Sequence, residues 1–135
     1  LEEEIADNFI SIGAIGRSAD QELVASFSNY GKTHVDLFAP GDDVYSSMPK
    51  NTYEYQGGTS MAAPIVSGVA AMLKAYYPQL SAKQLKRILM QSVTPLDIEV
   101  TVPSEEQTAP FSSLSRTGGI VNAYNALRLT QNILR

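Results

Sequence analysis

The chain has 135 residues, of which 14 are acidic, 10 are basic and one is histidine, giving a formal net charge of −4 at neutral pH. This length suits one domain around one hydrophobic core, and the acidic balance argues against a nucleic-acid binder, which needs a clustered basic surface. With no cysteine and one histidine, the composition excludes disulfides, cysteine nucleophiles and thiolate or multi-histidine metal sites. We therefore predict no cofactor and no metal site within the chain.

The amino terminus is unusual, because the first residue is Leu1 rather than Met. A natural start normally carries Met, so we expect the chain to be cut from a longer polypeptide, whose signal peptide would not be visible here. The acidic stretches Glu2–Glu4 and Glu105–Glu106 are interpreted as solvated charge.

Several short segments in the first half predict strands. Residues 9–15 (FISIGAI) form a nearly continuous apolar run, which is typical of a strand covered on both faces in a parallel sheet. Residues 35–39 alternate between apolar and other side chains, which predicts a second strand that stops at Pro40-Gly41. Residues 44–47 and 53–56 predict two further short strands joined by a turn.

Residues 59–77 predict a helix of a different kind. From Met61 to Leu73 no residue is charged, and a helix that is apolar on every side is either buried or spans a membrane. The uncharged stretch is shorter than the roughly 18–20 residues of a span, and Pro64 and Gly68 interrupt it. We therefore predict a buried central helix and no membrane span.

A second helix is predicted from its capping residues. Ser81 and Gln84 fit the S-x-x-Q capping box, with Leu80 and Leu85 placed as a hydrophobic staple. The apolar face at helical spacing consists of Leu85, Ile88 and Leu89. The outward-pointing cations are predicted to be Lys83, Lys86 and Arg87. The helix is expected to end at Thr94-Pro95.

The last part of the chain predicts a loop and a third helix. Residues 95–116 are rich in Pro, Ser, Thr and Glu, which indicates a solvated loop insertion. After Gly118-Gly119, four apolar residues recur at helical spacing, namely Ile120, Tyr124, Leu127 and Leu134. The predicted fold class is therefore α/β, with a few parallel strands and three helices, one of them central.

The segment Gly57-Gly58-Thr59-Ser60 lies between a predicted strand and the central helix, and three interpretations of it compete. Ser60 or Thr59 can be a simple N-cap. The glycines can cradle a phosphate, although the Lys that a P-loop requires does not follow. Ser60 can also be a nucleophile, because the unpaired N–H groups and partial positive charge of a helix start stabilise an oxyanion.

The longer string from Gly58 to Pro64 (GTSMAAP) resembles the nucleophile motif of subtilisin-like serine proteases, the subtilases of peptidase family S8. Other stretches resemble the same family in family order: residues 25–31 (ASFSNYG), 35–41 (VDLFAPG), 78–81 (PQLS) and 118–123 (GGIVNA). The resemblance covers about residues 8–94 and 117–130. It implies the subtilisin-like fold, a three-layer structure around a parallel sheet, and hydrolysis of peptide bonds by Ser–His–Asp acyl transfer.

The resemblance assigns a role to one catalytic residue. Ser60 matches the catalytic serine, and its backbone N–H would be one oxyanion donor. Met61, which follows it, would be a site of oxidation to the sulfoxide, or else ordinary core packing. The family's catalytic Asp and His, and its oxyanion Asn, lie upstream of the matched region, and Asn8 lacks the setting of that Asn. Residues 1–135 are thus expected to be a C-terminal fragment of a catalytic domain, inactive alone.

Two other candidate groups are given ordinary roles. His34 precedes Ser60 by 26 residues and shares a predicted strand face with Asp36. The family does not use that position for catalysis, so His34 is interpreted as a strand or loop histidine rather than the base. Asp42-Asp43 is interpreted as a solvated turn rather than a cation site, because calcium needs six or more oxygen ligands.

The resemblance also implies properties of the parent protein. It would be a secreted or cell-envelope endopeptidase with a polypeptide substrate, and calcium binding by the parent stays open. One alternative is a degenerate protease that serves as a non-catalytic binding module. Another is a sedolisin-like peptidase, which Met61–Pro64 disfavours. Removing upstream elements would expose core faces, so we predict self-association of the fragment, for example as a homodimer.

Overall fold

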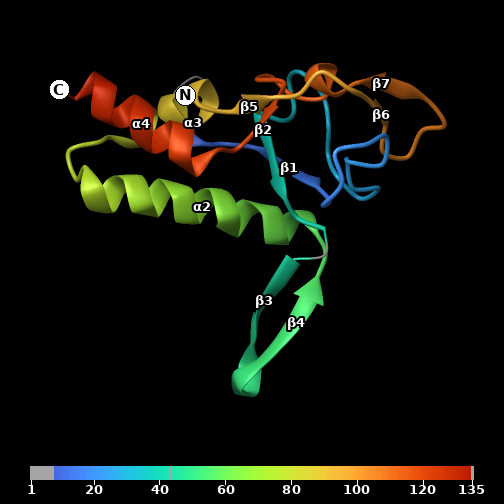
Figure 1. The fold of residues 1–135 in the computed structure, drawn as a ribbon, viewed down its shortest axis with the longest axis horizontal. Helices are drawn as coiled ribbons and strands as arrows, with labels where there is room; N and C mark the ends of the chain where they lie inside the picture. Colours follow the sequence, from blue (N-terminus) through green and yellow to red (C-terminus); the bar gives the residue numbers. More distant parts are fainter. Residues whose placement is uncertain (1–7, 43, 135) are drawn as a thin grey trace.

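The computed structural model describes residues 8–42 and 44–134, and its main sheet has four strands in the order β1-β2-β8-β5. β1 (Ile12–Ile15), β2 (Leu37–Pro40) and β8 (Gly119–Ile120) run parallel. β5 (Thr94–Pro95) pairs antiparallel with β8 at the edge. The predicted parallel sheet is confirmed, with one antiparallel strand added where a helix end was expected (Figure 1).

β2 is the most deeply buried strand of this sheet. Leu37, Phe38 and Ala39 all have no exposed surface, so the second predicted strand is confirmed and both of its faces are covered. The ring of Phe38 lies directly against Gly13 of β1, where any side chain would overlap it. The glycine is thus what allows a large ring to fill the space beside a parallel neighbour.

Three helices share one hydrophobic core with one face of the sheet: α2 (Thr59–Tyr76), α3 (Ala82–Gln91) and α4 (Ala123–Ile133). The buried residues of this core include Ala14, Leu37, Ala39, Ala62, Val66, Leu73, Ile88, Leu89 and Ala126. A second core on the opposite face contains Ile15, Leu23, Val24, Val35, Phe38, Val100, Val102, Phe111 and Leu114. Successive residues of β1 and β2 therefore point into different cores, as strand geometry requires.

The second core overturns the solvated loop predicted for residues 95–116. This segment forms an antiparallel hairpin of β6 (Glu99–Thr101) and β7 (Thr108–Pro110), followed by a 3-10 turn at Phe111–Ser113. Val100 and Phe111 are fully buried. The prediction failed because the Ser, Thr and Pro content outweighed a short period-2 pattern of apolar residues, which indicates a strand.

The central helix α2 is buried on one side only, which corrects the prediction of a helix covered all round. Its buried residues are Ala62, Val66 and Leu73. The other side carries the exposed residues Ala63, Pro64, Ser67, Gly68, Ala71 and Ala75. Among the described residues, no helix is long and apolar enough to cross a membrane.

The predicted start of α3 is confirmed in detail. The Gln84 N–H donates to the Ser81 hydroxyl at 3.2 Å, and the Ser81 N–H donates to the Gln84 side-chain oxygen at 2.8 Å. Ile88 and Leu89 are buried as expected. Lys86, predicted to point outward, instead lies with its Nζ 3.9 Å from the Asp36 carboxylate.

α4 begins at Ala123, later than the predicted start after Gly119, and it buries a different face. The Asn122 side chain caps its start by accepting from the Asn125 N–H at 2.9 Å. Ala126 and Thr130 are its buried residues, whereas Tyr124 is 65% exposed. Ile120 belongs to β8 rather than to the helix.

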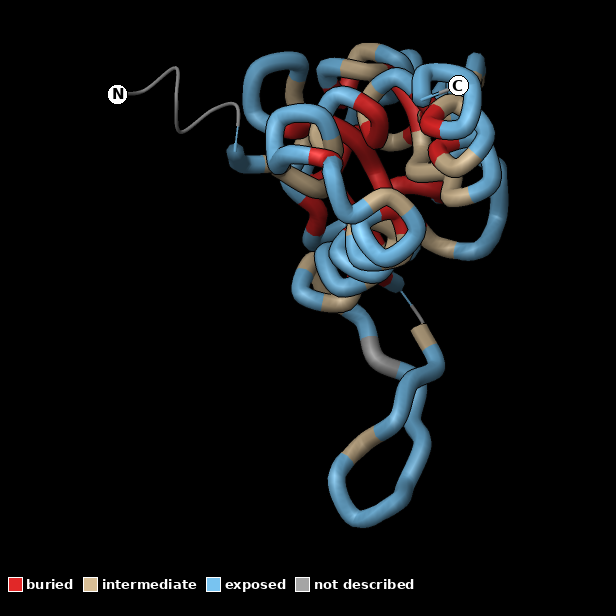
Figure 2. The backbone as a smooth tube through the Cα atoms, turned by 90° about the vertical axis from the view of Figure 1, so that its left-hand side faces the viewer, coloured by how far each residue is buried: buried red, intermediate tan, exposed pale blue. Residues whose placement is uncertain are grey.

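A second hairpin projects from this body and leads into α2. β3 (Val44–Met48) and β4 (Thr52–Gln56) pair antiparallel around a 3-10 turn at Pro49–Asn51, which confirms the two predicted strands. Figure 2 shows this hairpin standing away from the body, exposed along most of its length, while the buried residues gather in the body. The predictions for Glu2–Glu4 and Asp43 concern residues outside the described part of the chain.

Candidate functional site

The segment Gly57–Ser60 connects the projecting hairpin to α2. Gly58 adopts φ 152° and ψ 156°, a combination that only glycine takes without strain. Gly58 is the residue before the helix, α2 begins at Thr59, and no side chain caps its amino end. The interpretation of Thr59 or Ser60 as an N-cap is therefore wrong, and neither hydroxyl is used to cap the helix.

Ser60 is the second residue of α2 and its side chain is exposed. A methyl group on Gly58 would stand 3.3 Å from the Ser60 Oγ, so the glycine keeps the hydroxyl open to an incoming group. The first N–H groups of a helix have no acceptor within the helix, and its dipole adds partial positive charge there. A hydroxyl at this place can attack a carbonyl whose developing oxyanion meets backbone donors.

Backbone contacts hold this segment against the sheet. The Gly58 N–H donates to the Gly41 carbonyl at 2.8 Å, and the Gly41 N–H donates to the Ile15 carbonyl at 3.0 Å. A side chain at Gly41 would stand 2.7 Å from the Ala14 Cβ and 2.8 Å from the Ala62 Cβ. Gly41 follows the carboxyl end of β2, so Ser60 lies at the edge of the parallel sheet where open α/β folds bind ligands.

Pro64 interrupts the hydrogen bonding of α2 close to Ser60. It is the sixth residue of the helix. An N–H at this position would have bonded to the carbonyl of Ser60, and proline removes that bond. The proline therefore acts directly on the backbone of Ser60. Met61 is half-buried, and its oxidation stays a prediction.

His34 and Asp36 do not form the pair that shared strand geometry suggested. Asp36 is buried, and its carboxylate accepts from the Ser11 N–H at 2.9 Å and faces Lys86 and Arg116. His34 is exposed and precedes β2, whereas Gly41 and the Ser60 segment follow it. The extended chain from Leu37 to Gly41 alone spans about 13 Å. The side chain of His34 therefore lies too far from Ser60 for a hydrogen bond between them.

Asp42 lies beside the glycine segment, a proximity that its sequence context did not reveal. Its Oδ1 would stand 3.0 Å from a Cβ at Gly57, so the carboxylate rests against that glycine. Asp42 is exposed, which agrees with the turn interpretation. Among residues 8–42 and 44–134, no group of three or more His, Asp and Glu residues is placed to hold a metal ion.

The hairpin that leads to Ser60 carries an aromatic face that the sequence interpretation missed. Tyr45 lies opposite Tyr55 in the β3–β4 register with ring centroids 4.9 Å apart, and Tyr45 also stacks on Tyr53 at 5.6 Å. The Arg17 guanidinium lies 5.0 Å from the Tyr55 ring centroid. The signal was the spacing of two in Tyr53-x-Tyr55, which puts both rings on one side of a strand.

Comparison with known proteins gives a consistent result. The model of the subtilase family, Peptidase_S8, matches residues 3–119. Subtilisin DY from Bacillus licheniformis is 42% identical over 90 residues, which cover 67% of this chain and 31% of the relative. The cell wall-associated protease of Bacillus subtilis (strain 168) is 35% identical over 98 residues, covering 73% of this chain and 10% of the relative.

A solved structure agrees with these relatives. The patellamide maturation protease PatA superposes with a TM-score of 0.65 at 28% sequence identity, covering 93% of this chain and 44% of that chain. The present chain thus spans less than a third of the length of the two curated relatives.

Proposed function

Because the chain belongs to the subtilase family, we propose that Ser60 is the nucleophile of a serine endopeptidase, which hydrolyses peptide bonds by acyl transfer. The observation that carries the proposal is the position of this hydroxyl. It is exposed on the first turn of α2, does not cap the helix, and follows a Gly58 conformation that keeps space open above it. In the proposed reaction the Ser60 Oγ attacks the scissile carbonyl, and its own N–H donates to the oxyanion.

A serine hydroxyl also needs a general base, and the base needs a carboxylate that orients it. His34 is the single histidine of the chain and lies on the far side of β2 from Gly41. Asp36 is already bound to Ser11, Lys86 and Arg116. We therefore propose that the base and its carboxylate come from outside these 135 residues, and that the chain alone is inactive.

The proposal is tested by hydrolysis of a peptide ester and of a protein substrate by the parent polypeptide. The Ser60→Ala variant is expected to lose about 10⁶-fold in kcat, the scale measured for loss of the serine in subtilisin, a family member. Ser67→Ala is the matched control, because Ser67 is an exposed serine of the same helix, and full activity is expected. Equal activity of Ser60→Ala and the wild type would overturn the proposal.

The same assay separates a peptidase from a non-catalytic module. A parent that hydrolyses no peptide, but binds polypeptides equally well before and after the Ser60→Ala substitution, would be a binding protein of the subtilase fold. The peptidase is favoured because the hydroxyl of Ser60 is exposed and does not cap the helix. A serine with a purely structural role at a helix start commonly caps it.

We also make proposals about the substrate, the cellular compartment and the cofactor of the parent. We propose a polypeptide substrate, and secretion or retention in the cell envelope, as in the cell wall-associated relative. We assign no cofactor to this chain, and place any calcium dependence of the parent in residues outside it. Protease activity in culture medium or cell-wall extract, measured with and without a chelator, tests these points.

The exposed side of α2 supports a proposal about the isolated chain. Ala63, Ser67, Gly68 and Ala71 leave an exposed strip of small, mostly apolar residues, and exposed apolar surface favours association. We propose that two copies associate through this strip. Light scattering is expected to show a dimer that Ala71→Lys converts to a monomer, and a wild-type monomer at high concentration would contradict the proposal.

A further inference from the structure

A carboxylate and an aromatic ring flank Gly57, which precedes Ser60 by three residues. A Cβ at Gly57 would stand 3.0 Å from the Asp42 Oδ1 and 3.8 Å from the Phe27 Cε1. Both side chains reach solvent, because Asp42 is exposed and Phe27 is 46% exposed. Since Gly57 has no side chain, a group that approaches Ser60 along this segment can contact the ring and the carboxylate together.

The backbone holds the Asp42 carboxylate at the carboxyl end of the parallel strands. The Asp42 N–H donates to the Ile15 carbonyl at 3.2 Å, and the Asp42 Oδ2 lies 4.0 Å from the place that a Cβ would take at Gly16. Gly16 directly follows β1, and Asp42 comes shortly after the end of β2. The carboxylate thus lies between Gly16 and Gly57, neither of which has a side chain to cover it.

The pocket next to Asp42 is acidic. It has a volume of about 450 Å³ and extends to the turn that joins β6 to β7. Among the described residues that line it, three are acidic, namely Glu22, Asp42 and Glu105, and none is basic. Glu22 and Glu105 accept hydrogen bonds from hydroxyl groups, which are neutral and leave the negative charge in place. The guanidinium of Arg17 lies over the Tyr55 ring, 5.0 Å from its centroid. The pocket therefore attracts a cation.

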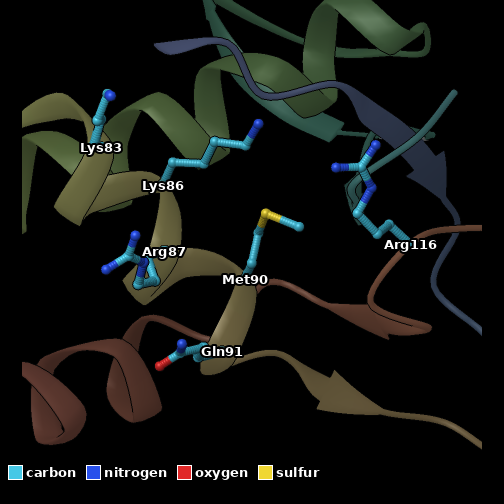
Figure 3. Close-up of a pocket in the computed structure, with 6 residues that line it drawn as sticks. All are labelled: Lys83, Lys86, Arg87, Met90, Gln91 and Arg116. Carbon is cyan, nitrogen blue, oxygen red and sulfur yellow. The ribbon is translucent and has the colours of Figure 1, made fainter. Parts of the chain in front are cut away.

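Four cations of the chain line a different pocket, near the opposite end of β2. This second pocket has a volume of about 300 Å³, and its cations are Lys83, Lys86, Arg87 and Arg116 (Figure 3). Lys86 and Arg116 face Asp36, which directly precedes β2, whereas Asp42 follows that strand. The strand separates the two carboxylates by about 13 Å, which exceeds the Debye length of about 8 Å at physiological salt. These cations therefore offset little of the charge in the acidic pocket.

A polypeptide bound at Ser60 brings its own side chains within reach of Asp42. Consecutive Cα atoms are about 3.8 Å apart, so those of Gly57 and Ser60 are at most about 11 Å apart. An extended peptide covers a similar distance in about three residues. A lysine or arginine up to about three positions from the scissile bond can thus lay its methylene stem on the Phe27 ring and place its cation at Asp42.

We propose that Asp42 is a specificity-determining residue, which selects substrates with a lysine or arginine within about three residues of the scissile bond. The inference rests on the proposed function of Ser60 as the nucleophile. Phe27 contacts the stem of the basic side chain, and Asp42 pairs with its charge. Since both groups are exposed, the charge pair raises kcat/KM by about fivefold, the upper end for exposed ion pairs.

Hydrolysis of a peptide series by the parent polypeptide tests this selection. The peptides share one sequence, except that lysine, norleucine or glutamate is placed in turn at each position within this range of the cleaved bond. Norleucine resembles the lysine stem without its charge. We expect lysine to exceed norleucine about fivefold in kcat/KM at one position or more. Asp42→Asn should bring that ratio close to unity, and Asp42→Lys should favour glutamate at the same position.

The matched control is Asp97→Asn, because Asp97 is an exposed carboxylate that does not line the acidic pocket. This variant should keep the preference for lysine. In about 1 M NaCl, where the Debye length falls to about 3 Å, the preference should shrink in the wild type and in Asp97→Asn alike.

Two results would overturn the selection by Asp42 and leave the peptidase function standing. One is an equal kcat/KM for lysine and norleucine at every position, and the other is an undiminished preference for lysine in Asp42→Asn. A parent that hydrolyses none of the peptides, and whose Ser60 is not labelled by a fluorophosphonate, would refute the proposed function and this inference together.

Discussion

β2 and the β3–β4 hairpin are neighbours in the chain, yet they pack in opposite ways. Leu37, Phe38 and Ala39 of β2 have no exposed surface and separate two hydrophobic cores. In the hairpin, Tyr45 and Tyr53 are 58% and 61% exposed, and their rings stack on each other. The change occurs within four residues, between Pro40 and Val44.

The buried strand and the exposed hairpin therefore have different roles. The buried strand makes a scaffold, and the exposed hairpin leads directly to Ser60. Ser60 itself lies at the junction, where the Gly58–Gly41 hydrogen bond ties the exposed segment to the end of the buried strand. Reactive groups commonly occur on segments of this kind, held by a rigid sheet.

Among the variants that test this contrast, removal of the Phe38 ring is expected to have the largest effect on stability. This ring is fully buried, and its centroid lies 5.0 Å from that of Phe111. Phe38→Ala should lower the free energy of unfolding by about 3–5 kcal/mol, measured by urea denaturation. Tyr53→Ala, the matched aromatic truncation in the hairpin, should cost less than about 1 kcal/mol. Equal losses would contradict the division into a buried and an exposed region.

Gly41→Ala tests the junction between the two regions. The added methyl group would stand 2.7 Å from the Ala14 Cβ and 3.0 Å from the Gly58 carbonyl oxygen. We expect a loss of about 1–3 kcal/mol in stability. In the parent, a loss of about 10²-fold in kcat should accompany it, because the Ser60 segment shifts. A variant with unchanged kcat would show that this clamp does not position the nucleophile.

Gly68→Ala is the matched control for the Gly41→Ala variant. Gly68 lies in the interior of α2, and a Cβ there would meet no atom within 4 Å. Since alanine favours helix more than glycine does, the substitution should add about 0.8–1 kcal/mol of stability to the monomeric Ala71→Lys chain. Thermal unfolding measures the change. A destabilised variant would mean that this side of α2 is covered even in the monomer.

The smallest expected effect concerns Tyr30, whose hydroxyl donates to the Glu105 carboxylate at 2.9 Å. This hydrogen bond raises the pKa of Tyr30 above its usual 10.0. The stabilising contribution is therefore fully present below pH 10 and is lost as pH rises through the raised pKa of the folded state. Tyr30→Phe should lower the Tm slightly at pH 7, and the difference from wild type should shrink above pH 10. A pH-independent difference would exclude this contribution.

The sequence predicted the elements whose signals are local. The capping box at Ser81 and Gln84 and the paired strands of the hairpin were recognised because a few adjacent residues determine each. The start of α2 was predicted for the same reason, and the glycines before Ser60 indicated a tight turn.

What the sequence could not predict depends on contacts between distant residues. Val100 and Phe111 are buried because they pack on the face of the sheet that carries Phe38, far earlier in the chain. Lys86 turns inward because Asp36 needs a cation, and α4 buries Thr130 rather than Tyr124 because of its neighbours. The Gly41–Gly58 clamp likewise joins segments whose separation in the chain hides their contact.

We propose that Ser60 is a nucleophile whose base lies outside this chain. Treating the parent polypeptide and the 135-residue chain with a fluorophosphonate, and mapping the adduct by mass spectrometry, tests it most directly. We predict rapid labelling of Ser60 in the parent, no labelling of Ser67, and no labelling of the 135-residue chain. Rapid modification of Ser60 in the isolated chain, or modification of another serine in the parent, would contradict the claim.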